Sequence, residues 1–330
     1  MHDCAGGNRQ SRAATAPIAY NGNMSEPWAY LDGAWVPASA AAVSVFDAGF
    51  VLGATVAEQL RTFGGRLFHR DDHLDRLAHS LEIIGVELDM PRAELAATAE
   101  ELVARNHRLL AAGDDLGLSI FVTPGPYTSY LPAGAARPPR PTLGLHTYPL
   151  PFHLWAEKYA AGEAVVATDV RQVPDCCWPA TLKCRSRMHY YLADRQAAAT
   201  QPGSRALLLD EAGCITEAST ANLLVYRRDA GLLSPPLSKI LHGISLAVAM
   251  QLAGELGITT AERDLTPEDV AAADETMLTS TPLCLLPVTR FNGRAIGTGR
   301  PGPVAAALLE AWGRLVGLDI AGQARAFARR

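Results

Sequence analysis

The chain has 330 residues, a formal net charge of −5 and a mean hydropathy near zero (+0.06), with 48% hydrophobic residues. This length suits two domains or one large one and is ample for burying a core. With 29 basic against 34 acidic residues, the chain offers no electrostatic basis for binding nucleic acid or an anionic membrane surface.

Both ends of the chain are expected to be loose tails. Residues 1–26 mix Gly, Asn, Ser and Ala and lack the apolar run of a signal peptide. Residues 319–330 are expected to be a second tail. No segment approaches the ~18 to 20 apolar residues of a membrane-spanning helix. The cysteines have no zinc-site spacing, so we expect no metal site and reduced thiols in a cytoplasmic protein.

Residues 27–150 are expected to form a first α/β domain. A hairpin around Asp32-Gly33 opens it, because Asp-Gly is a strong turn signal. Apolar residues at helical spacing predict a helix that begins at Asp71 and ends at Gly85, and a second helix that begins at Pro91 and ends at Gly113. Strands are expected at residues 28–37 (as the hairpin), 54–63, 116–122 and 143–148. A long Pro/Gly/Arg-rich loop occupies residues 123–141.

A linker is expected at residues 151–158, followed by a second domain at residues 159–318. Its predicted strands are at residues 164–170, 206–209, 214–217, 223–226 and 274–278, and its predicted helices are at residues 186–199, 246–256 and 303–315, with a short helix capped by Thr266. We see no internal repeats.

One lysine and one glutamate in this half are candidate chemical groups. Lys183 stands at a strand-to-helix junction, where burial or nearby cations would lower its pKa and free the amine to form a Schiff base. Glu217 ends a strand beside small residues, so a flat ring could approach its carboxylate and keep a pyridine nitrogen protonated. Considered alone, Lys183 is more simply explained as a surface lysine.

Residues 207–226, LLLDEAGCITEASTANLLVY, together with Lys183 upstream, resemble the core of the class IV (fold type IV) pyridoxal-phosphate-dependent aminotransferases. This family includes branched-chain and D-amino-acid aminotransferases, (R)-amine transaminases and 4-amino-4-deoxychorismate lyases. HLDRL at 73–77, Gly-Ile-Ser at 243–245 and Leu-Thr-Ser-Thr at 278–281 follow the family pattern in the same order. The resemblance runs from about Trp28 to Trp312.

The resemblance implies an α/β (α+β) fold of two domains, a smaller N-terminal α/β sandwich and a larger C-terminal barrel-like domain. It implies pyridoxal 5'-phosphate as cofactor, with Lys183 as the catalytic residue joined to it and Glu217 at its pyridine nitrogen. Leu241 would pack on the ring, and the phosphate would be bound by Arg76, Gly243, Ile244, Ser245, Ser280 and Thr281. A homodimer is expected, because the family builds its active site at a dimer interface.

The expected substrate pocket departs from the family pattern, at Leu52, Ala57, Arg61, Pro124, Arg187, Met188 and Pro282. Ala57 replaces a common aromatic, and Arg61 matches an arginine of the branched-chain type. Pro124 replaces the carboxylate-binding arginine of the D-specific type, and Pro282 has no N–H to offer. The substrate carboxylate would then be held by Arg185 or Arg187, or by the long loop through Tyr127, Tyr130, Arg137 or Arg140.

The expected reaction is transamination from an amino acid, preferably a branched-chain-like L-amino acid, to a 2-oxo acid, with Lys183 moving the proton as general base and acid. Three alternatives are open. The same lysine could catalyse the β-elimination of the aminodeoxychorismate lyases. The donor could be a D-amino acid or an (R)-amine. A non-catalytic protein could keep the fold and the cofactor, although the intact Lys183 and Glu217 argue against it.

Overall fold

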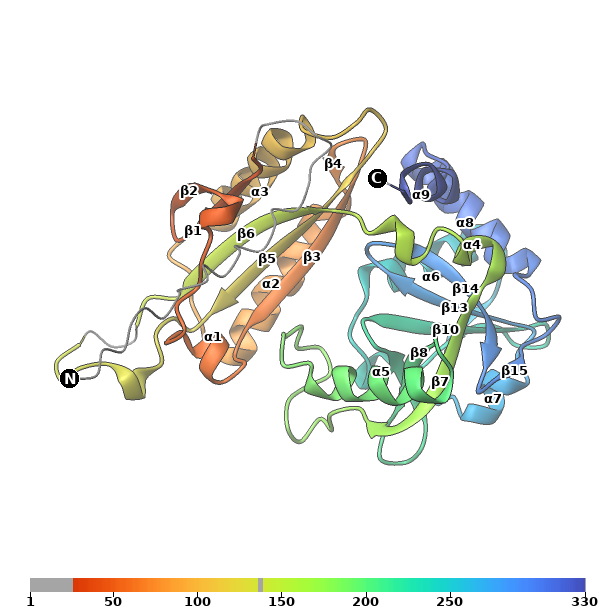
Figure 1. Ribbon diagram of the computed structural model, residues 1–330. Helices are drawn as coiled ribbons and strands as arrows, with labels where there is room; N and C mark the ends of the chain where they lie inside the picture. Colours follow the sequence, from red (N-terminus) through yellow and green to blue (C-terminus); the bar gives the residue numbers. More distant parts are fainter. Residues whose placement is uncertain (1–25, 136–138, 330) are drawn as a thin grey trace, which may run out of the picture.

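The computed structural model of the chain describes residues 26–135 and 139–329 (Figure 1). The tail expected at residues 1–26 lies outside the described residues, apart from Glu26. Within these described ranges, no helix is both long and apolar enough to cross a membrane.

The first part of the chain forms a six-stranded sheet with the strand order β2-β1-β6-β5-β3-β4. Its strand pairings are antiparallel. One face is covered by α2 (Arg70–Ile84) and α3 (Arg92–His107), and the short α1 (Ala48–Val51) precedes β3 (Figure 1). The strands are β1 (Trp28–Leu31), β2 (Ala34–Pro37), β3 (Val56–Phe63), β4 (Arg66–Leu67), β5 (Leu116–Thr123) and β6 (Thr142–Pro149).

The two faces of this sheet differ because successive side chains of a strand point to opposite sides. Leu60 pairs directly with Leu118, and both are buried in a core shared with Leu77 of α2. Gln59, Ser119 and His146 form the adjacent cross-strand row, whose side chains point away from the helices. The first sheet therefore presents a polar row to the second half of the molecule.

The second part of the chain forms a nine-stranded sheet with the order β12-β11-β10-β13-β14-β7-β8-β9, in which β15 pairs with β14. Because β9 also pairs with β10, the strands from β10 through β13, β14, β7 and β8 to β9 close into a ring. The strands are β7 (Glu163–Arg171), β8 (Arg205–Leu209), β9 (Ile215–Ala218), β10 (Ala221–Arg227), β11 (Gly231–Ser234), β12 (Thr260–Glu262), β13 (Glu275–Ser280), β14 (Cys284–Phe291) and β15 (Arg294–Ala295). The ring gives the barrel-like domain that the resemblance implied.

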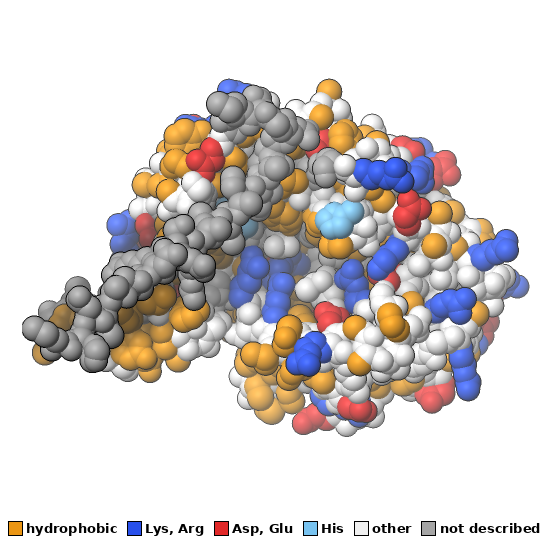
Figure 2. Space-filling view, in the orientation of Figure 1, with side chains coloured by type: hydrophobic (Ala, Val, Ile, Leu, Met, Phe, Trp, Pro, Cys, Tyr) orange, Lys and Arg blue, Asp and Glu red, His pale blue; other side chains and the backbone are white. Residues whose placement is uncertain are grey.

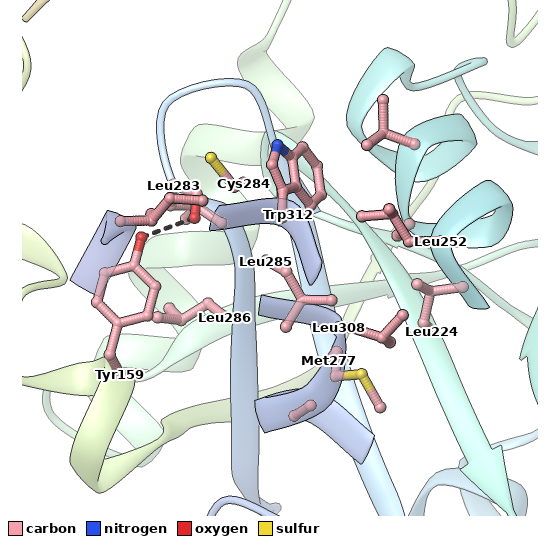
Figure 3. Packing of buried hydrophobic residues seen from close by; sticks show 14 of the residues in the cluster. Tyr159, Leu224, Leu252, Met277, Leu283, Cys284, Leu285, Leu286, Leu308 and Trp312 are labelled. Carbon is pink, nitrogen blue, oxygen red and sulfur yellow. Dashed lines mark hydrogen bonds between the residues drawn. The ribbon is translucent and has the colours of Figure 1, made fainter. Parts of the chain in front are cut away.

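Helices pack on the outside of this ring. On one side, α5 (Met188–Thr200) buries Ala193 and Ala197 against β7 and β8. On another, α6 (Ile244–Glu255) and α8 (Pro303–Val316) enclose a large apolar core around Trp312, where Tyr159 donates a 2.7 Å hydrogen bond to the Leu283 carbonyl (Figure 3). Shorter helices are α4 (Lys158–Ala161), α7 (Pro267–Ala271) and α9 (Ile320–Phe327).

Most predicted elements are present, with shifted ends. The helix expected from Asp71 begins at Arg70, so Asp71 lies in its first turn instead of capping it. The next helix ends at His107 rather than near Gly113. Thr266 caps α7 as expected, in a capping box with Asp269.

Three regions differ more from expectation. Residues 319–330 are not only a tail, because α9 lies there, with the Asp319 side chain accepting a hydrogen bond from Gly322 N. The strand β14 was not among the expected strands, and it carries Pro287, a residue unusual in a central strand. Residues 151–158 include Phe152 and Trp155, which are buried in the second core, so this segment is packed rather than a free linker. The exact domain limits stay a prediction.

Candidate active site

A cavity of about 150 Å³ between the two parts of the molecule brings together most of the predicted site residues. Arg76 comes from α2 of the first part, whereas Lys183 lies in the segment that leads to α5. The cavity is also lined by the predicted residues Arg187, Leu241, Gly243, Ile244, Ser245, Ser280, Thr281 and Pro282. Residues more than 200 positions apart in the sequence therefore face one space.

The lysine segment is tied to the first sheet by its backbone. Ala57 N donates to the Lys183 carbonyl at 3.0 Å, and Lys183 N donates to Ser80 Oγ of α2 at 3.2 Å. Burial of the Lys183 amine, opposed by Glu58 and assisted by Arg76 and the arginines that follow the lysine, lowers its pKa from 10.5 to about 7. A substantial fraction of this amine is therefore neutral and nucleophilic at neutral pH.

Arg76 is held by Glu58, a residue that the sequence reasoning missed. Arg76 Nε and Nη2 donate to the two Glu58 oxygens at 2.8 Å each, and Nη1 donates to the His242 carbonyl at 2.7 Å. Burial opposes ionisation of Glu58, but the Arg76 charge and the hydrogen bonds from Arg76 and His73 outweigh it and lower the pKa to about 2. A glutamate in the middle of a predicted strand was the signal available in the sequence, because a buried carboxylate needs a partner.

Glu217 lies behind the cavity at the end of β9. Its oxygens accept hydrogen bonds from the Tyr190 hydroxyl, from Gln172 Nε2 at 3.0 Å and from Asn222 Nδ2 at 3.4 Å. Burial raises the pKa of this carboxyl, while these hydrogen bonds favour the ionised form. A positively charged ring nitrogen is the kind of partner that would offset the remaining cost of burying the anion.

The amino end of α6 forms part of the cavity wall, next to the Arg76 side chain from α2. Gly243 precedes the helix, and no side chain of the described residues caps it. A Cβ atom on Gly243 would lie 1.9 Å from Asn222 Oδ1, so any larger residue there would have to displace Asn222 or the start of α6. Free amides at a helix start and a nearby guanidinium suit a phosphate group. Together with the reactive lysine and the carboxylate, these residues fit pyridoxal phosphate.

The predicted substrate-pocket residues are dispersed. Leu52, Met188 and Arg187 line a second cavity of about 800 Å³, and Arg187 lines both cavities. Pro282 lines the first. Ala57 and Pro124 line neither of these two cavities, and Ala57 is fully buried, so their expected contact with substrate is not supported. Arg137 lies outside the described residues.

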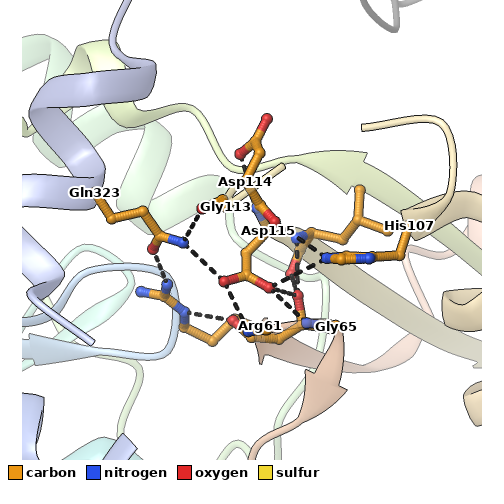
Figure 4. Close-up of polar contacts among 10 residues, drawn as sticks. Arg61, Gly65, His107, Gly113, Asp114, Asp115 and Gln323 are labelled. Atoms are coloured by element: carbon orange, nitrogen blue, oxygen red, sulfur yellow. Dashed lines mark hydrogen bonds and ion pairs between the residues drawn. The ribbon is translucent and has the colours of Figure 1, made fainter. Parts of the chain in front are cut away.

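Arg61 also has a different place from the one expected. It is buried, and its guanidinium donates to the Pro282 carbonyl at 2.9 Å and to Gln323 Oε1 of α9 at 3.0 Å. Gln323 Nε2 in turn donates to Asp115 Oδ2 at 2.8 Å (Figure 4). Arg61 therefore supports the rim of the cavity from outside, as part of a network that joins the two parts of the molecule, and does not itself face the substrate space.

In the described ranges, no group of three or more His, Cys, Asp or Glu side chains is arranged to hold a metal ion.

Comparison with known proteins agrees with this geometry. A sequence profile of the amino-transferase class IV family matches residues 55–291, a range that includes Glu58, Arg76, Lys183 and Glu217. The chain belongs to this family. It is therefore a pyridoxal-phosphate-dependent aminotransferase, and the predicted family, fold class, reaction and cofactor are confirmed.

The relatives of this class IV aminotransferase are named for different substrates. The D-alanine aminotransferase of Bacillus licheniformis is 32% identical over 81% of this chain and 89% of its own length. A putative branched-chain-amino-acid aminotransferase of Methanocaldococcus jannaschii is 28% identical over 85% of this chain and 93% of its own. The branched-chain aminotransferase of Thermoproteus uzoniensis, solved with norvaline, has a TM-score of 0.77 and 25% identity, covering 91% of this chain and 96% of that one.

The pKa of Lys183 can be tested directly, because the chain has only two other lysines, Lys158 and Lys239. We expect the Lys183 amine of the cofactor-free protein to be protonated below about pH 7 and neutral above it. Lys239 should stay protonated to high pH, since hydrogen bonds from its amine to Asp264 and Asp210 raise its pKa. Reductive ¹³C-methylation followed by an NMR pH titration measures this, with Lys183→Ala assigning the signal. A Lys183 signal that titrates near pH 10 contradicts the expectation.

Replacement of Gly243 by alanine should weaken cofactor binding about tenfold or more, since the new Cβ displaces Asn222 or the start of α6. The matched control is Gly254→Ala in the same helix, where a Cβ meets nothing within 4 Å and helix propensity improves. Fluorescence titration of the cofactor-free proteins with pyridoxal phosphate gives both dissociation constants. Equal affinities in the two variants would show that the close packing at Gly243 is irrelevant.

Proposed function

We propose that pyridoxal phosphate and substrate meet in the cavity at Lys183, and that the enzyme transfers the amino group of an aliphatic amino acid to a 2-oxo acid. The observation that supports this most is the buried Lys183 amine, whose pKa is lowered to about 7. It shares one cavity with Arg76 and with the amino end of α6, and Glu217 stands behind that cavity.

The residues around the cavity divide between the two ends of the cofactor. Arg76 and the hydroxyl of Thr281 would bind the phosphate together with Ser280 and the backbone of residues 243–245. Leu241 would contact the ring face, and the Glu217 carboxylate would face the ring nitrogen. The bound cofactor supplies an electron sink for the bond broken at the substrate Cα.

Lys183 is the base and acid of the proposed reaction. Its amine, neutral above about pH 7, would accept the proton from the substrate Cα and deliver it to the carbon on the other side of the amino nitrogen, two bonds away. Burial keeps water from the amine, and the positive charges of Arg76 and Arg187 disfavour its protonated form. Because Glu58 neutralises much of the Arg76 charge, the amine can still hold the proton that it takes from the substrate Cα.

The proposed donor is an aliphatic amino acid because Leu52, Trp178 and Met188 give the second cavity an apolar wall. A branched-chain-like L-amino acid stays the first choice for the donor. Arg61, which favoured the branched-chain type in sequence, no longer supports that choice, since it is buried in the network with Gln323. D-alanine is the competing donor, because one relative of higher identity is named for it.

We expect the visible absorption spectrum of the protein reconstituted with pyridoxal phosphate to change on addition of L-leucine or of D-alanine. When a 2-oxo acid acceptor is also present, the donor that reacts should be converted to its own 2-oxo acid. Lys183→Ala should lower the rate by about 10²- to 10⁴-fold, the range typical for loss of a general acid–base group. Lys239→Ala is the control, since this lysine pairs with Asp210 and Asp264 instead. Formation of pyruvate from a substrate without any acceptor would indicate elimination instead and overturn the proposal.

We also propose that the active form is a homodimer in the cytoplasm. An apolar surface near the second cavity supports the dimer: Phe46, Phe50, Leu52, Met188 and Tyr191 are large and exposed, with Phe50 73% accessible. Free thiols at Cys176 and Cys177 are consistent with a reducing compartment. Sedimentation velocity should give about twice the 35.1 kDa chain mass, and Phe50→Glu should shift it toward one chain. A single-chain mass for the active wild type contradicts the dimer.

A further inference from the structure

Two arginines follow the catalytic lysine closely and face the same region. Arg185 and Arg187 are two and four residues beyond Lys183 in the segment that leads to α5. Arg187 lines the cavity of Lys183 as well as the adjoining cavity of about 800 Å³, and Arg185 lines the adjoining one. Figure 2 shows Lys or Arg side chains in the hollow between the two parts of the molecule. Both guanidinium groups are thus placed where a substrate bound at Lys183 would extend.

Neither guanidinium is neutralised by the protein. Arg185 Nη2 donates to Ser119 Oγ at 2.7 Å, and Arg187 Nε donates to the Cys184 carbonyl at 3.3 Å. Across residues 26–135 and 139–329, neither forms an ion pair with a carboxylate, in contrast to Arg76 with Glu58. Partial burial of the guanidinium, followed by the charge of Arg187, lowers the pKa of Arg185. Two like charges held together in this way are unfavourable unless an anion joins them.

The surface beneath Arg185 is polar but uncharged. It is the row of Gln59, Ser119 and His146 on the open face of the first sheet. Burial, together with the charge of Arg185, lowers the pKa of His146, so this histidine adds no competing negative or positive charge at neutral pH. An anion that enters the recess therefore meets two cations and neutral hydrogen-bonding groups.

At Pro282, the opposite rim of the cavity offers no hydrogen-bond donor to an anion. Proline has no backbone N–H, and the Pro282 carbonyl already accepts a hydrogen bond from Arg61. Arg76 is paired with Glu58, bonded to the His242 carbonyl and, in the proposed function, used for the cofactor phosphate. Among these cations near Lys183, Arg185 and Arg187 are therefore the pair that is not already bound to a carboxylate.

We propose that Arg185 and Arg187 form the subsite that binds the substrate carboxylate. A guanidinium binds a carboxylate through paired, charge-assisted hydrogen bonds, which add geometric specificity to affinity. The enzyme therefore selects amino acids and 2-oxo acids over simple amines of the same carbon skeleton. This inference rests on the proposed function, because it assigns the substrate class of the same site.

The test compares two donors that differ only in the carboxylate, leucine (the enantiomer that reacts) and 3-methylbutylamine. In the pyridoxal-phosphate-loaded enzyme, Arg187→Gln and Arg185→Gln should each lower kcat/KM for leucine by about 10- to 100-fold, the range expected for loss of a charged hydrogen bond. The amine has no carboxylate to lose, so its rate should change only through the effect of the arginine charge on Lys183 and should fall by a clearly smaller factor than that of leucine. Arg294→Gln, on the exposed strand β15, is the matched control.

A second readout does not depend on turnover. The carboxylate 4-methylpentanoate, which lacks the reacting amine, should compete with leucine, and its inhibition constant should rise with the same two substitutions. Arg187→Lys, which keeps the charge but loses the planar fork, should give an intermediate loss. Equal losses for leucine and the amine would indicate a structural role and overturn the subsite. So would unchanged inhibition constants. If the wild-type enzyme reacts with no donor at all, the proposed function itself fails.

Discussion

The ion pair between Glu58 and Arg76 is the interaction on which the rest of the site depends. Both groups are largely withdrawn from water, so each would be costly without the other. The pair fixes the direction of the remaining Arg76 nitrogen, which reaches the His242 carbonyl just before α6. A single side chain on α2 thereby sets the distance between the first sheet and the helix whose amino end borders the cofactor cavity.

The strand β3 supplies three separate supports for the site. Glu58 orients Arg76 on the helix side, Ala57 N holds the Lys183 carbonyl, and Arg61 holds the Pro282 carbonyl. These contacts reach the phosphate end, the lysine and the far rim of one cavity. A shift of β3 along its own axis would therefore move all three together, and the pairing of this strand with β5 along most of its length opposes such a shift.

The sequence was sufficient for the parts of the site that depend on local pattern. Lys183, the hairpin that carries Glu217 and the glycine before α6 are each recognisable within a few residues of chain. The supporting contacts are different, because Arg61 and Gln323 are 262 positions apart and no spacing relates them. Arg61 was therefore assigned to the substrate. The strand β14 was also not predicted. It contains Pro287, and proline is usually confined to edge strands, whereas β14 lies between β13 and β7 inside the second sheet.

The position of Gln323 has a consequence for how the two parts of the molecule depend on each other. This residue of α9 accepts a hydrogen bond from a buried arginine at position 61 and donates one to a buried aspartate at position 115. Both partners belong to the first part of the molecule, more than 200 positions earlier in the chain. The polar groups buried at this edge of the first sheet therefore gain their full set of partners only when α9 is packed against it.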